Sequence, residues 1–417
     1  MRILMLISEL GYGGAEGSFL RLARQLAKSH QVKIAVFKEE YDSIHYSSSE
    51  APDDLEVHRL DRLERHDRFS RWWRRSREFK RLRKEFCPHV TISFLSGPNL
   101  LNVITGGPGK RIVSVRGSRQ YDAHAGRRAN LAYKYLVDPI VWSRADIIVT
   151  VSQGLAGELA RSAPSARAKI ETISGYVDSD KLIASATEPV EPDFERLAGM
   201  PLIVAAGRLS PEKGFDHLLR IFAQVKNRLP AARLLLIGDG PSRRDLEREA
   251  EQLGLTHGSA PDSEQVDLIL PGFRPDPHRY FRLGKAFVLC SASEGFPNVL
   301  IEALASGTNV VAGDVPWGGR EILEIPADID GRPYPTVQPA QTAIGFLMPR
   351  IDDPASQSHW VEVLCRLAAE KRPKRASVAR ALERVRSLDC RHAAERWSLL
   401  IERTSQESKK QAPLARC

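Results

Sequence analysis

Two successive series of short apolar segments, each followed by a turn and a helical pattern, constrain the fold of this 417-residue chain most strongly. The first series begins with an apolar run at 1–8, a glycine-rich turn at 11–17 and a helical segment that leads to a second apolar run at 31–37. A strand, a turn, a helix and a strand form a βαβ unit, which requires a parallel sheet. Further runs of buried-strand type stand at 90–94, 111–115 and 146–152. The series predicts a doubly wound α/β domain over residues 1–183.

The second series of apolar runs begins after a segment of different composition. Residues 184–200 contain two prolines and no clear period, so they are expected to form a linker. The runs that follow end near glycine, serine or aspartate and stand at 202–207, 233–240, 266–273, 286–293 and 308–314. They predict a second doubly wound domain over 201–385, then a C-terminal helix at 386–404 that packs back on the first domain and a polar tail at 405–417. Ligands of such domains bind at the carboxyl ends of strands, so the strand exits matter most.

Composition and cysteine use narrow the class further. The apolar fraction of 42% and the charged fraction of 27% are typical of a globular protein and exclude extensive disorder. Five scattered cysteines form no CxxC pattern, so neither a disulfide framework nor a zinc site is expected. Glu9 interrupts the first apolar run too early for a signal peptide, and no apolar stretch approaches the roughly 18 residues of a spanning helix. We therefore expect a protein of a reducing, soluble compartment that meets a membrane only from its surface.

The positive charge of the chain is concentrated in one segment. The formal net charge is +9, and residues 61–86 alone contain 11 basic and 5 acidic residues. Aromatic residues recur there near helical spacing, which predicts a basic helix with a narrow apolar stripe. The helix could lie on an anionic membrane with Trp72, Trp73 and Phe79 at the headgroup level, bind nucleic acid, or pack its aromatic residues on the first-domain sheet. We favour the anionic membrane surface and do not expect nucleic acid as a partner.

Residues 291–323 carry the most informative motif. A strand delivers Glu294 to a turn, Pro297 suits the first helical turn that follows, and Gly307 ends the helix. A helix that begins at a strand exit presents free backbone N–H groups and the positive end of its dipole, which favours phosphate. Glu302 lies about 12 Å along the axis from Glu294, too far for the two carboxylates of a retaining glycosidase, which stand about 5 Å apart. The two carboxylates are better placed to hold two parts of one extended ligand.

A second motif, at 205–216, places two cations beside another strand exit. The strand ends at Gly207, and Arg208 and Lys213 project from the loop that follows. Two cations in this position can neutralise a diphosphate leaving group, Arg208 through its planar fork and Lys213 as a point charge. The alternative is a pair of solvated surface charges. Together with the helix at 291–323, the cations favour a site for a phosphate-bearing ligand.

The chain closely resembles glycosyltransferase family 4 in three places: the loop GRLSPEKG, the E-x7-E pattern of EGFPNVLIEALASG and the GGAE turn near the start. The resemblance covers nearly the whole chain and implies a retaining enzyme of the GT-B architecture, with two Rossmann-like doubly wound domains that face each other across a cleft. The run GDVPWGGREIL is similar to a bacterial subset that builds lipopolysaccharide, capsule and protein-linked glycans, often from UDP-hexose or UDP-N-acetylhexosamine. That subset usually reads closer to Ser-Gly-Pro-Arg-Glu, so Trp317, Gly318 and Gly319 are departures.

The resemblance implies roles for the charged motif residues. Arg208 and Lys213 would hold the donor diphosphate and stabilise its departing charge. Glu294 would contact sugar hydroxyls close to the anomeric carbon, and Glu302 would contact the nucleotide ribose. The rest of the pyrophosphate and sugar pocket is expected to include Gly207, Gly295, Phe296, Pro297, Asn298, Val299 and Leu300.

Other residues are expected at the edges of this site. Phe273 and Arg274, at a strand exit, are candidates for the nucleobase pocket, and the alternative is a simple strand-end turn. Gly13 and Gly14 would let the first domain approach the donor and the acceptor closely. The loop that contains Arg116 and His124 is basic, so it either receives a phosphate-bearing or sugar acceptor or is merely solvated.

The resulting expectation is a retaining glycosyltransferase of cell-envelope polysaccharide biosynthesis. It would move a hexose or N-acetylhexosamine from a nucleotide sugar, with UDP as the expected nucleotide, to a glycan or lipid-linked acceptor. The nucleotide sugar is a substrate, and no cofactor or metal is expected, since no Asp-x-Asp pair stands at a strand exit. The expected location is cytoplasmic and peripheral on the inner membrane. The alternatives are a nucleotide-sugar 2-epimerase of GT-B architecture and a non-catalytic glycan-binding protein.

Overall fold

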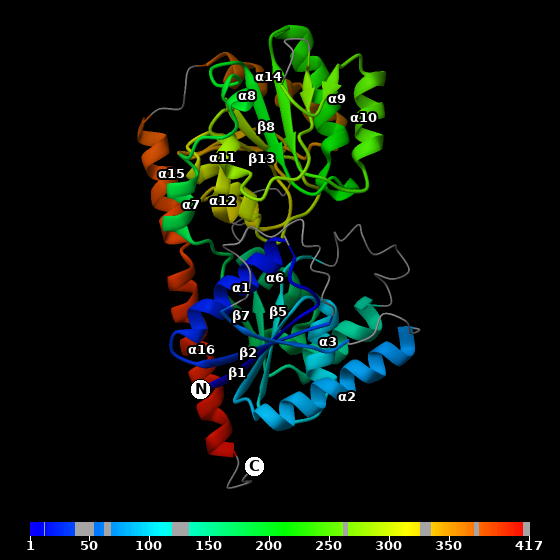
Figure 1. Ribbon diagram of the computed structural model, residues 1–417, viewed down its shortest axis with the longest axis vertical. Coiled ribbons are helices and arrows are strands. Elements are labelled where there is room, and N and C mark those ends of the chain that lie inside the picture. The colour runs from blue at the N-terminus through cyan, green and yellow to red at the C-terminus, as the bar shows by residue number, and fades with distance from the viewer. Residues whose placement is uncertain are drawn as a thin grey trace. The chain divides into compact units, whose positions relative to one another are not determined.

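The computed structural model describes residues 1–11, 13–37, 54–61, 68–118, 133–261, 266–325, 335–370 and 375–411. These residues form two α/β units (Figure 1). The first unit contains the described residues up to Val177 and from Leu388 onward, and the second contains those from Asp178 to Ser387. Each unit is built on one sheet, and every strand pair is parallel except the last pair of the second sheet. The predicted pair of doubly wound α/β domains is confirmed.

The first sheet has seven strands in the order β3-β2-β1-β4-β5-β6-β7. The strands are β1 (Arg2–Ile7), β2 (Gln31–Val36), β3 (Glu56–Arg59), β4 (Val90–Phe94), β5 (Lys110–Val115), β6 (Ile147–Thr150) and β7 (Ile170–Thr172). The strand order reverses at β1, where Ile3 lies opposite Val32 of β2 and Val90 of β4. The central strands are almost wholly apolar and buried, as parallel strands between helical layers require.

Helices pack on this sheet, and the C-terminal helix is one of them. They are α1 (Gly14–Ala27), α2 (Arg68–Phe86), α3 (Ser96–Ile104), α5 (Asp138–Arg144), α6 (Gln153–Ser162) and α16 (Cys390–Gln411), with a π-turn at Tyr133–Val137 and a 3-10 turn at Pro164–Lys169. Helix α16 runs beside α1 (Figure 1), and its Trp397 stacks on Phe94 at a centroid distance of 6.3 Å. The polar tail expected from residue 405 therefore begins inside α16, and residues 412–417 lie outside the described part. Among the helices described, none is long and apolar enough to cross a bilayer.

Helix α2 corresponds to the basic segment predicted over 61–86, of which residues 62–67 lie outside the described part. Its apolar stripe packs on the sheet: Phe79 is fully buried, and Trp72 is half-buried with its ring edge-on to a neighbouring phenylalanine. Trp73, by contrast, is 61% exposed. The expectation that Phe79 reaches lipid headgroups is wrong, because its ring is part of the core of the first unit, and Trp72 packs against that core with part of its surface exposed. Of the three aromatic residues, Trp73 is at the surface.

A buried arginine ties α2 to the end of α3. The Arg83 guanidinium donates to the carbonyl oxygens of Asn102 at 3.1 Å, Thr105 at 3.0 Å and Pro108 at 3.1 Å. These carbonyls belong to the last turn of α3 and the segment after it, where backbone acceptors lack helical partners. Burial lowers the pKa of Arg83 to about 10, so the side chain still carries its charge at neutral pH. Arg83 therefore fixes the inner side of α2.

The second sheet has eight strands in the order β10-β11-β9-β8-β12-β13-β15-β14. The strands are β8 (Leu202–Ala206), β9 (Arg233–Ile237), β10 (His257–Gly258), β11 (Leu268–Ile269), β12 (Ala286–Leu289), β13 (Asn309–Gly313), β14 (Ala340–Gln341) and β15 (Phe346–Met348). Here the strand order reverses at β8, which pairs with β9 on one side and β12 on the other. In sheets of this kind the carboxyl ends of such strands are the usual ligand position.

The helices of the second unit include two that precede its first strand. They are α7 (Ser179–Ser185), α8 (Pro192–Glu195), α9 (Phe215–Arg228), α10 (Arg243–Gln252), α11 (His278–Phe281), α12 (Asn298–Ala305), α13 (Gly318–Ile322), α14 (Gln357–Ala369) and α15 (Arg375–Ser387), with 3-10 turns at Pro211–Lys213 and Pro354–Ser356. Trp360 of α14 is fully buried, and its indole N–H donates to the Pro349 carbonyl at 2.9 Å. The fully buried indole shows that α14 forms part of the core of this unit.

The segment 184–200, expected as a linker, is instead part of the second unit. Its two prolines do not mark an open connector, because Pro192 begins α8. Phe194 of that helix is buried and meets the Tyr280 ring edge-on at a centroid distance of 5.3 Å. The hydroxyl of Tyr280 also donates to Glu191 at 2.6 Å. The correction has a simple cause: the apolar and charged groups of this short segment find partners on α11.

Candidate active site

The two sequence motifs meet where the order of the second sheet reverses. Strand β8 continues into Gly207 and the 3-10 turn Pro211–Lys213, and its neighbour β12 continues into residues 290–297. Gly214 lets the two loops touch. Its φ of +66° is in the left-handed region, and a Cβ atom there would lie 2.4 Å from the carbonyl oxygen of Cys290. A residue with a side chain would push the loops apart.

Lys213 and Glu294, predicted from separate motifs, form an ion pair between these loops. Lys213 Nζ donates to Glu294 Oε1 at 2.7 Å, and the side chains are 26% and 14% exposed. Burial lowers the pKa of Lys213, but the Glu294 carboxylate outweighs this effect, and the pKa ends above its usual value. The ammonium group is therefore charged at neutral pH and held toward a carboxylate. The pair offers a cation and an acceptor to one ligand.

Arg208 belongs to the same loop after β8 as Lys213, and it is exposed. Within the described part of the chain, its guanidinium has no ion pair and no hydrogen bond.

The loop that contains Arg208 depends on a glycine, Gly238, that the sequence analysis did not identify. A Cβ atom on Gly238, at the exit of β9, would lie 1.9 Å from the Gly207 carbonyl oxygen. The close approach of the two strand exits therefore requires glycine at position 238. The signal in the sequence was the run GDG at 238–240.

Helix α12 begins directly after Glu294 and the turn that follows it. The motif predicts Pro297 in the first helical turn; the structure places it one position earlier, as the N-cap residue, and Asn298 is the first residue of the helix. Glu302, expected to contact the ribose, is half-buried on the same helix. Leu300 has a different role from the one expected: it is fully buried, and its N–H donates to the Pro297 carbonyl at 3.0 Å. Leu300 therefore positions the helix and offers no free group to a ligand.

The remaining residues of this turn differ in exposure. Gly295 and Pro297 are buried, whereas Phe296, Asn298 and Val299 are half-buried. The three half-buried residues keep part of their surface accessible to a ligand. Their contact with the donor stays a prediction.

A loop from β13 closes against Glu294. The N–H of Trp317 donates to the Glu294 carbonyl at 2.6 Å, and the two residues form a parallel bridge. Both ends of the loop are held by the buried pair of Asp314 and Arg320, whose side chains are 0% and 6% exposed. Arg320 Nε donates to Asp314 Oδ1 at 2.7 Å. Sequence reasoning missed this pair because its signal, GDVPWGGREIL, was used only for the resemblance.

Gly318 is expected to tolerate no side chain, unlike its neighbour Gly319. A Cβ atom on Gly318 would lie 2.6 Å from Phe296 Cα and 2.7 Å from the Gly295 carbonyl oxygen, whereas one on Gly319 would meet nothing within 4 Å. Gly318→Ala should lower the free energy of unfolding by about 1–3 kcal/mol, the usual cost of overpacking. Gly319→Ala, the matched control, should be close to wild type in the same urea titration. Equal effects would contradict the close approach.

Arg274 is engaged in the strand-end turn rather than directed at a nucleobase. Its Nη1 donates to the carbonyl oxygens of Pro271 at 2.8 Å and Phe273 at 3.1 Å, and its Nε donates to the Tyr280 hydroxyl at 3.2 Å. The structure thus favours the alternative interpretation for Arg274. Phe273 is half-buried, and its place in the base pocket stays a prediction.

The residues expected on the acceptor side belong to the first unit. Gly13 is the N-cap of α1 and is exposed with Gly14. Arg116 follows β5 and lies over the Phe94 ring at 4.9 Å. Both therefore stand at the carboxyl edge of the first sheet. His124 lies outside the described residues. Across the described ranges of both units, no cluster of three or more His, Cys, Asp or Glu side chains suits a metal ion.

Comparison with known families decides the class. The chain matches the model of the glycosyl transferase 4-like domain over residues 13–175 and that of glycosyl transferases group 1 over residues 191–325. The chain belongs to glycosyltransferase family 4. Its resemblance to that family is thereby confirmed, including the GT-B architecture of its members.

Curated relatives of this family 4 protein are distant. It is 28% identical over 284 residues to an uncharacterized glycosyltransferase of Methanocaldococcus jannaschii, which covers 66% of each chain. It is 27% identical over 194 residues to a Campylobacter jejuni enzyme, the N-acetylgalactosamine-N,N'-diacetylbacillosaminyl-diphospho-undecaprenol 4-alpha-N-acetylgalactosaminyltransferase, which covers 46% of this chain and 48% of that one. The chain thus spans about half to two thirds of the length of these relatives.

Solved structures similar to this family 4 protein share its fold over nearly its whole length. Sucrose-phosphate synthase from Thermosynechococcus elongatus has a TM-score of 0.73 and 19% identity. The match covers 97% of this chain and 99% of the synthase chain. Anabaena HepE in complex with UDP and glucose has a TM-score of 0.70 and 14% identity, and covers 96% and 99%. At these identities the likeness shows the fold alone.

Proposed function

We propose that this protein is a retaining glycosyltransferase that moves a hexose or N-acetylhexosamine from a nucleotide sugar, with UDP as the nucleotide, to a glycan or lipid-linked acceptor. The observation that carries the proposal is the Lys213–Glu294 ion pair between neighbouring strand exits, with the exposed Arg208 in the same loop as Lys213. Two cations and one carboxylate are the groups that a sugar diphosphate needs. Membership of family 4 and the UDP found with HepE support the donor class.

The chemistry assigns one task to each of these side chains. Arg208 and Lys213 stabilise the charge that develops on the diphosphate as its bond to the anomeric carbon breaks. Backbone N–H groups at the start of α12 add to that stabilisation. Glu294 holds sugar hydroxyls and thereby orients the ring. The acceptor oxygen forms the new bond on the same face of the sugar, and its proton passes to the leaving diphosphate oxygen. No protein nucleophile is required.

The acceptor in this proposal is carried by a lipid or a growing glycan. The Campylobacter relative bears the name of an enzyme that acts on a diphospho-undecaprenol-linked sugar. A lipopolysaccharide core glycosyltransferase of Rhizobium meliloti matches as well, with 29% identity over 155 residues that cover 36% of this chain and 41% of that one. A lipid-linked acceptor requires the enzyme to work at a membrane surface, and a nucleotide sugar places that surface on the cytoplasmic side.

Mass-spectrometric detection of UDP release tests the proposal. The protein is incubated with a panel of nucleotide sugars, each with and without a bacterial lipid extract. We expect one donor to release UDP at a rate that depends on the extract. Acceptor-independent release together with a free epimeric sugar would instead identify a 2-epimerase. Binding of a glycan without any UDP release would identify a non-catalytic binding protein.

A further inference from the structure

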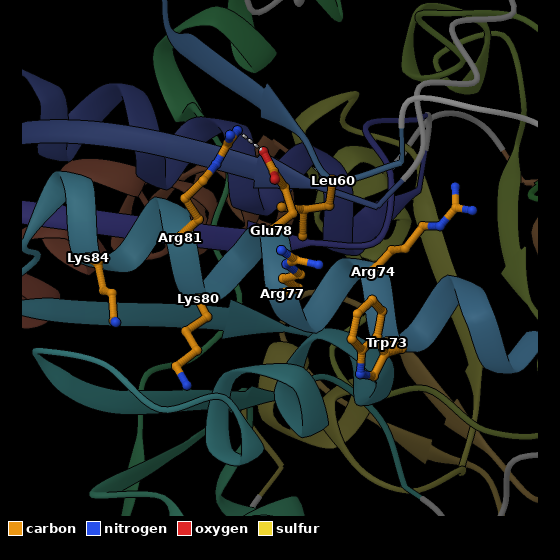
Figure 2. A pocket seen from close by; sticks show the side chains of 8 residues that line it. All are labelled: Leu60, Trp73, Arg74, Arg77, Glu78, Lys80, Arg81 and Lys84. Carbon is orange, nitrogen blue, oxygen red and sulfur yellow. Dashed lines mark hydrogen bonds and ion pairs between the residues drawn. The ribbon is translucent and has the colours of Figure 1, made fainter.

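Helix α2 presents a row of cations that the proposed chemistry does not use. The side chains at the surface of this helix include those of Trp73, Arg74, Arg77, Lys80, Arg81 and Lys84. They recur every three or four residues, so they occupy one face, and Arg74 and Lys84 are about 15 Å apart along the axis. Together with Leu60 and Glu78 they line a surface groove of about 740 Å³ (Figure 2).

Most of this positive charge is not neutralised. Arg81 pairs with Glu78 and lies near Glu85, and Figure 2 shows it turned toward Glu78. Lys80 and Lys84 project from the helix on the same side as Trp73 (Figure 2), and neither meets a carboxylate among the described residues. Within the described ranges, Arg74 and Arg77 also have no ion pair with a carboxylate. The surface therefore combines several free cations with few anions.

Trp73 is the aromatic member of this surface. Its side chain is 61% exposed, and the Arg77 guanidinium lies 5.5 Å from the centre of its ring. An indole ring on a basic surface suits the boundary between lipid headgroups and acyl chains. A single exposed ring offers no row of stacking platforms, which single-stranded nucleic acid would use. The surface thus fits a bilayer better than a nucleic acid.

The inner side of α2 makes this surface rigid. Phe79 is fully buried in the core of the first unit, and Arg83 is anchored on the carbonyls at the end of α3. Rotation of the helix about its axis would bury cations and expose Phe79. The row of cations is therefore held toward the outside of the first unit.

We propose that this face of α2 docks on an anionic bilayer, with Trp73 at the headgroup level and the cations over the lipid phosphates. Part of the motivation rests on the proposed function, because a lipid-linked acceptor lies in such a surface. The contacts differ from those expected from the sequence, since Phe79 is in the core and the half-buried Trp72 packs against it. Attraction between these cations and anionic lipid would bring the first unit to the membrane surface in which a lipid-linked acceptor lies.

Vesicle sedimentation of the intact protein tests this docking. We expect binding to vesicles of phosphatidylcholine with phosphatidylglycerol, weak binding to phosphatidylcholine alone, and release by salt. Lys80→Gln/Lys84→Gln should weaken binding to the anionic vesicles about 25-fold, as two cations near such a surface imply. The matched control is Arg228→Gln/Arg386→Gln, which removes the same charge from exposed positions of the second unit and should bind like wild type. Trp73→Ser should weaken binding to the same vesicles and abolish any blue shift of the fluorescence.

Three results would overturn the docking. These are equal binding to both kinds of vesicle, equal loss in the two double variants, and retention of a 20-nucleotide RNA without retention of vesicles. Donor-dependent UDP release in detergent is measured on the same preparations, and it reports on the proposed function separately. If the protein releases UDP but does not bind anionic vesicles, the docking is refuted and the proposed function stands.

A second inference concerns the donor sugar and rests on a different observation. Trp317 is bridged to Glu294 in parallel register, and the Glu294 N–H donates to the Pro316 carbonyl at 2.9 Å. The N–H of Trp317 also donates to the Glu294 carbonyl at 2.6 Å, so the two backbones are held together. The half-buried Trp317 is therefore a direct neighbour of Glu294, the residue to which we assign the sugar hydroxyls.

We infer that the Trp317 ring packs against the apolar face of the donor sugar and helps to select it. This inference rests on the proposed function. A pyranose presents a row of C–H bonds on one face, and an indole ring supplies a large, rigid apolar surface for it. The polar edge of the sugar then meets Glu294. A serine in place of Trp317 would leave the nucleotide contacts intact and remove the contact to the sugar.

Calorimetric titration with UDP and with the nucleotide sugar that wild type turns over separates these contacts. Trp317→Ser should weaken binding of the nucleotide sugar about tenfold, with UDP affinity within twofold of wild type. Trp317→Phe should recover most of the loss, and Trp73→Ser is the control that changes neither. An equal loss for both ligands, or no loss, would overturn the inference. If wild type bound no nucleotide sugar at all, the proposed function would fail as well.

Discussion

Replacing Lys213 by alanine is expected to lower the rate of sugar transfer by about 10²–10³-fold, the usual cost of removing one preorganised group that meets transition-state charge. The ammonium is held 2.7 Å from Glu294 and remains charged at neutral pH, so it is in place before the donor binds. Glu294→Gln should have a comparable effect, because it removes the charge that aligns Lys213. Transfer of radiolabel from the nucleotide sugar measures both variants.

The control for this prediction is another ion pair of the same unit. Lys226 pairs with Asp267 at nearly the same exposure, 24% and 14%, but outside the candidate site. Lys226→Ala should therefore cost stability without loss of transfer. Wild-type rates in Lys213→Ala and Glu294→Gln would remove these residues from the mechanism. An equal fall in Lys226→Ala would assign the effect to folding instead.

Replacing Arg320 by methionine is expected to lower the free energy of unfolding by about 3–5 kcal/mol, because it leaves the fully buried Asp314 carboxylate without its cation. The second single variant is Asp314→Leu, and the double variant combines both changes. The double variant should lose much less unfolding free energy than the sum of the two single losses, since no uncompensated charge then remains. Urea unfolding of the two single variants and the double variant measures the coupling. Additive losses would show that the pair does not act as a unit.

The central part of the site was predictable because its signals are local. Glu294 and Lys213 each follow a buried strand, and parallel strands bring their carboxyl ends to one edge of a sheet. Their pairing at 2.7 Å needed only that the two strands, β8 and β12, be neighbours. Pro297 likewise marks a helix start through the restricted backbone of proline itself.

Other features depend on partners distant in the sequence, and no local signal predicts those. Leu300 reads as part of the pocket motif, but its burial depends on how α12 packs. Phe194 lies in a proline-containing stretch typical of a linker, and its packing against Tyr280 holds that stretch to the second unit. The stripe of α2 was visible in the sequence, whereas the division between buried Phe79 and exposed Trp73 required the sheet beneath it.

The central claim is that the Lys213–Glu294 site transfers a sugar from a nucleotide donor with retention of configuration. Wild-type protein is incubated with a radiolabelled nucleotide sugar and a bacterial lipid extract, and the labelled product is isolated and examined by NMR. We predict label in the lipid or glycan fraction, with the sugar joined in the same anomeric configuration as in the donor. Inverted configuration, or no label transferred from any nucleotide sugar tested, would contradict the claim.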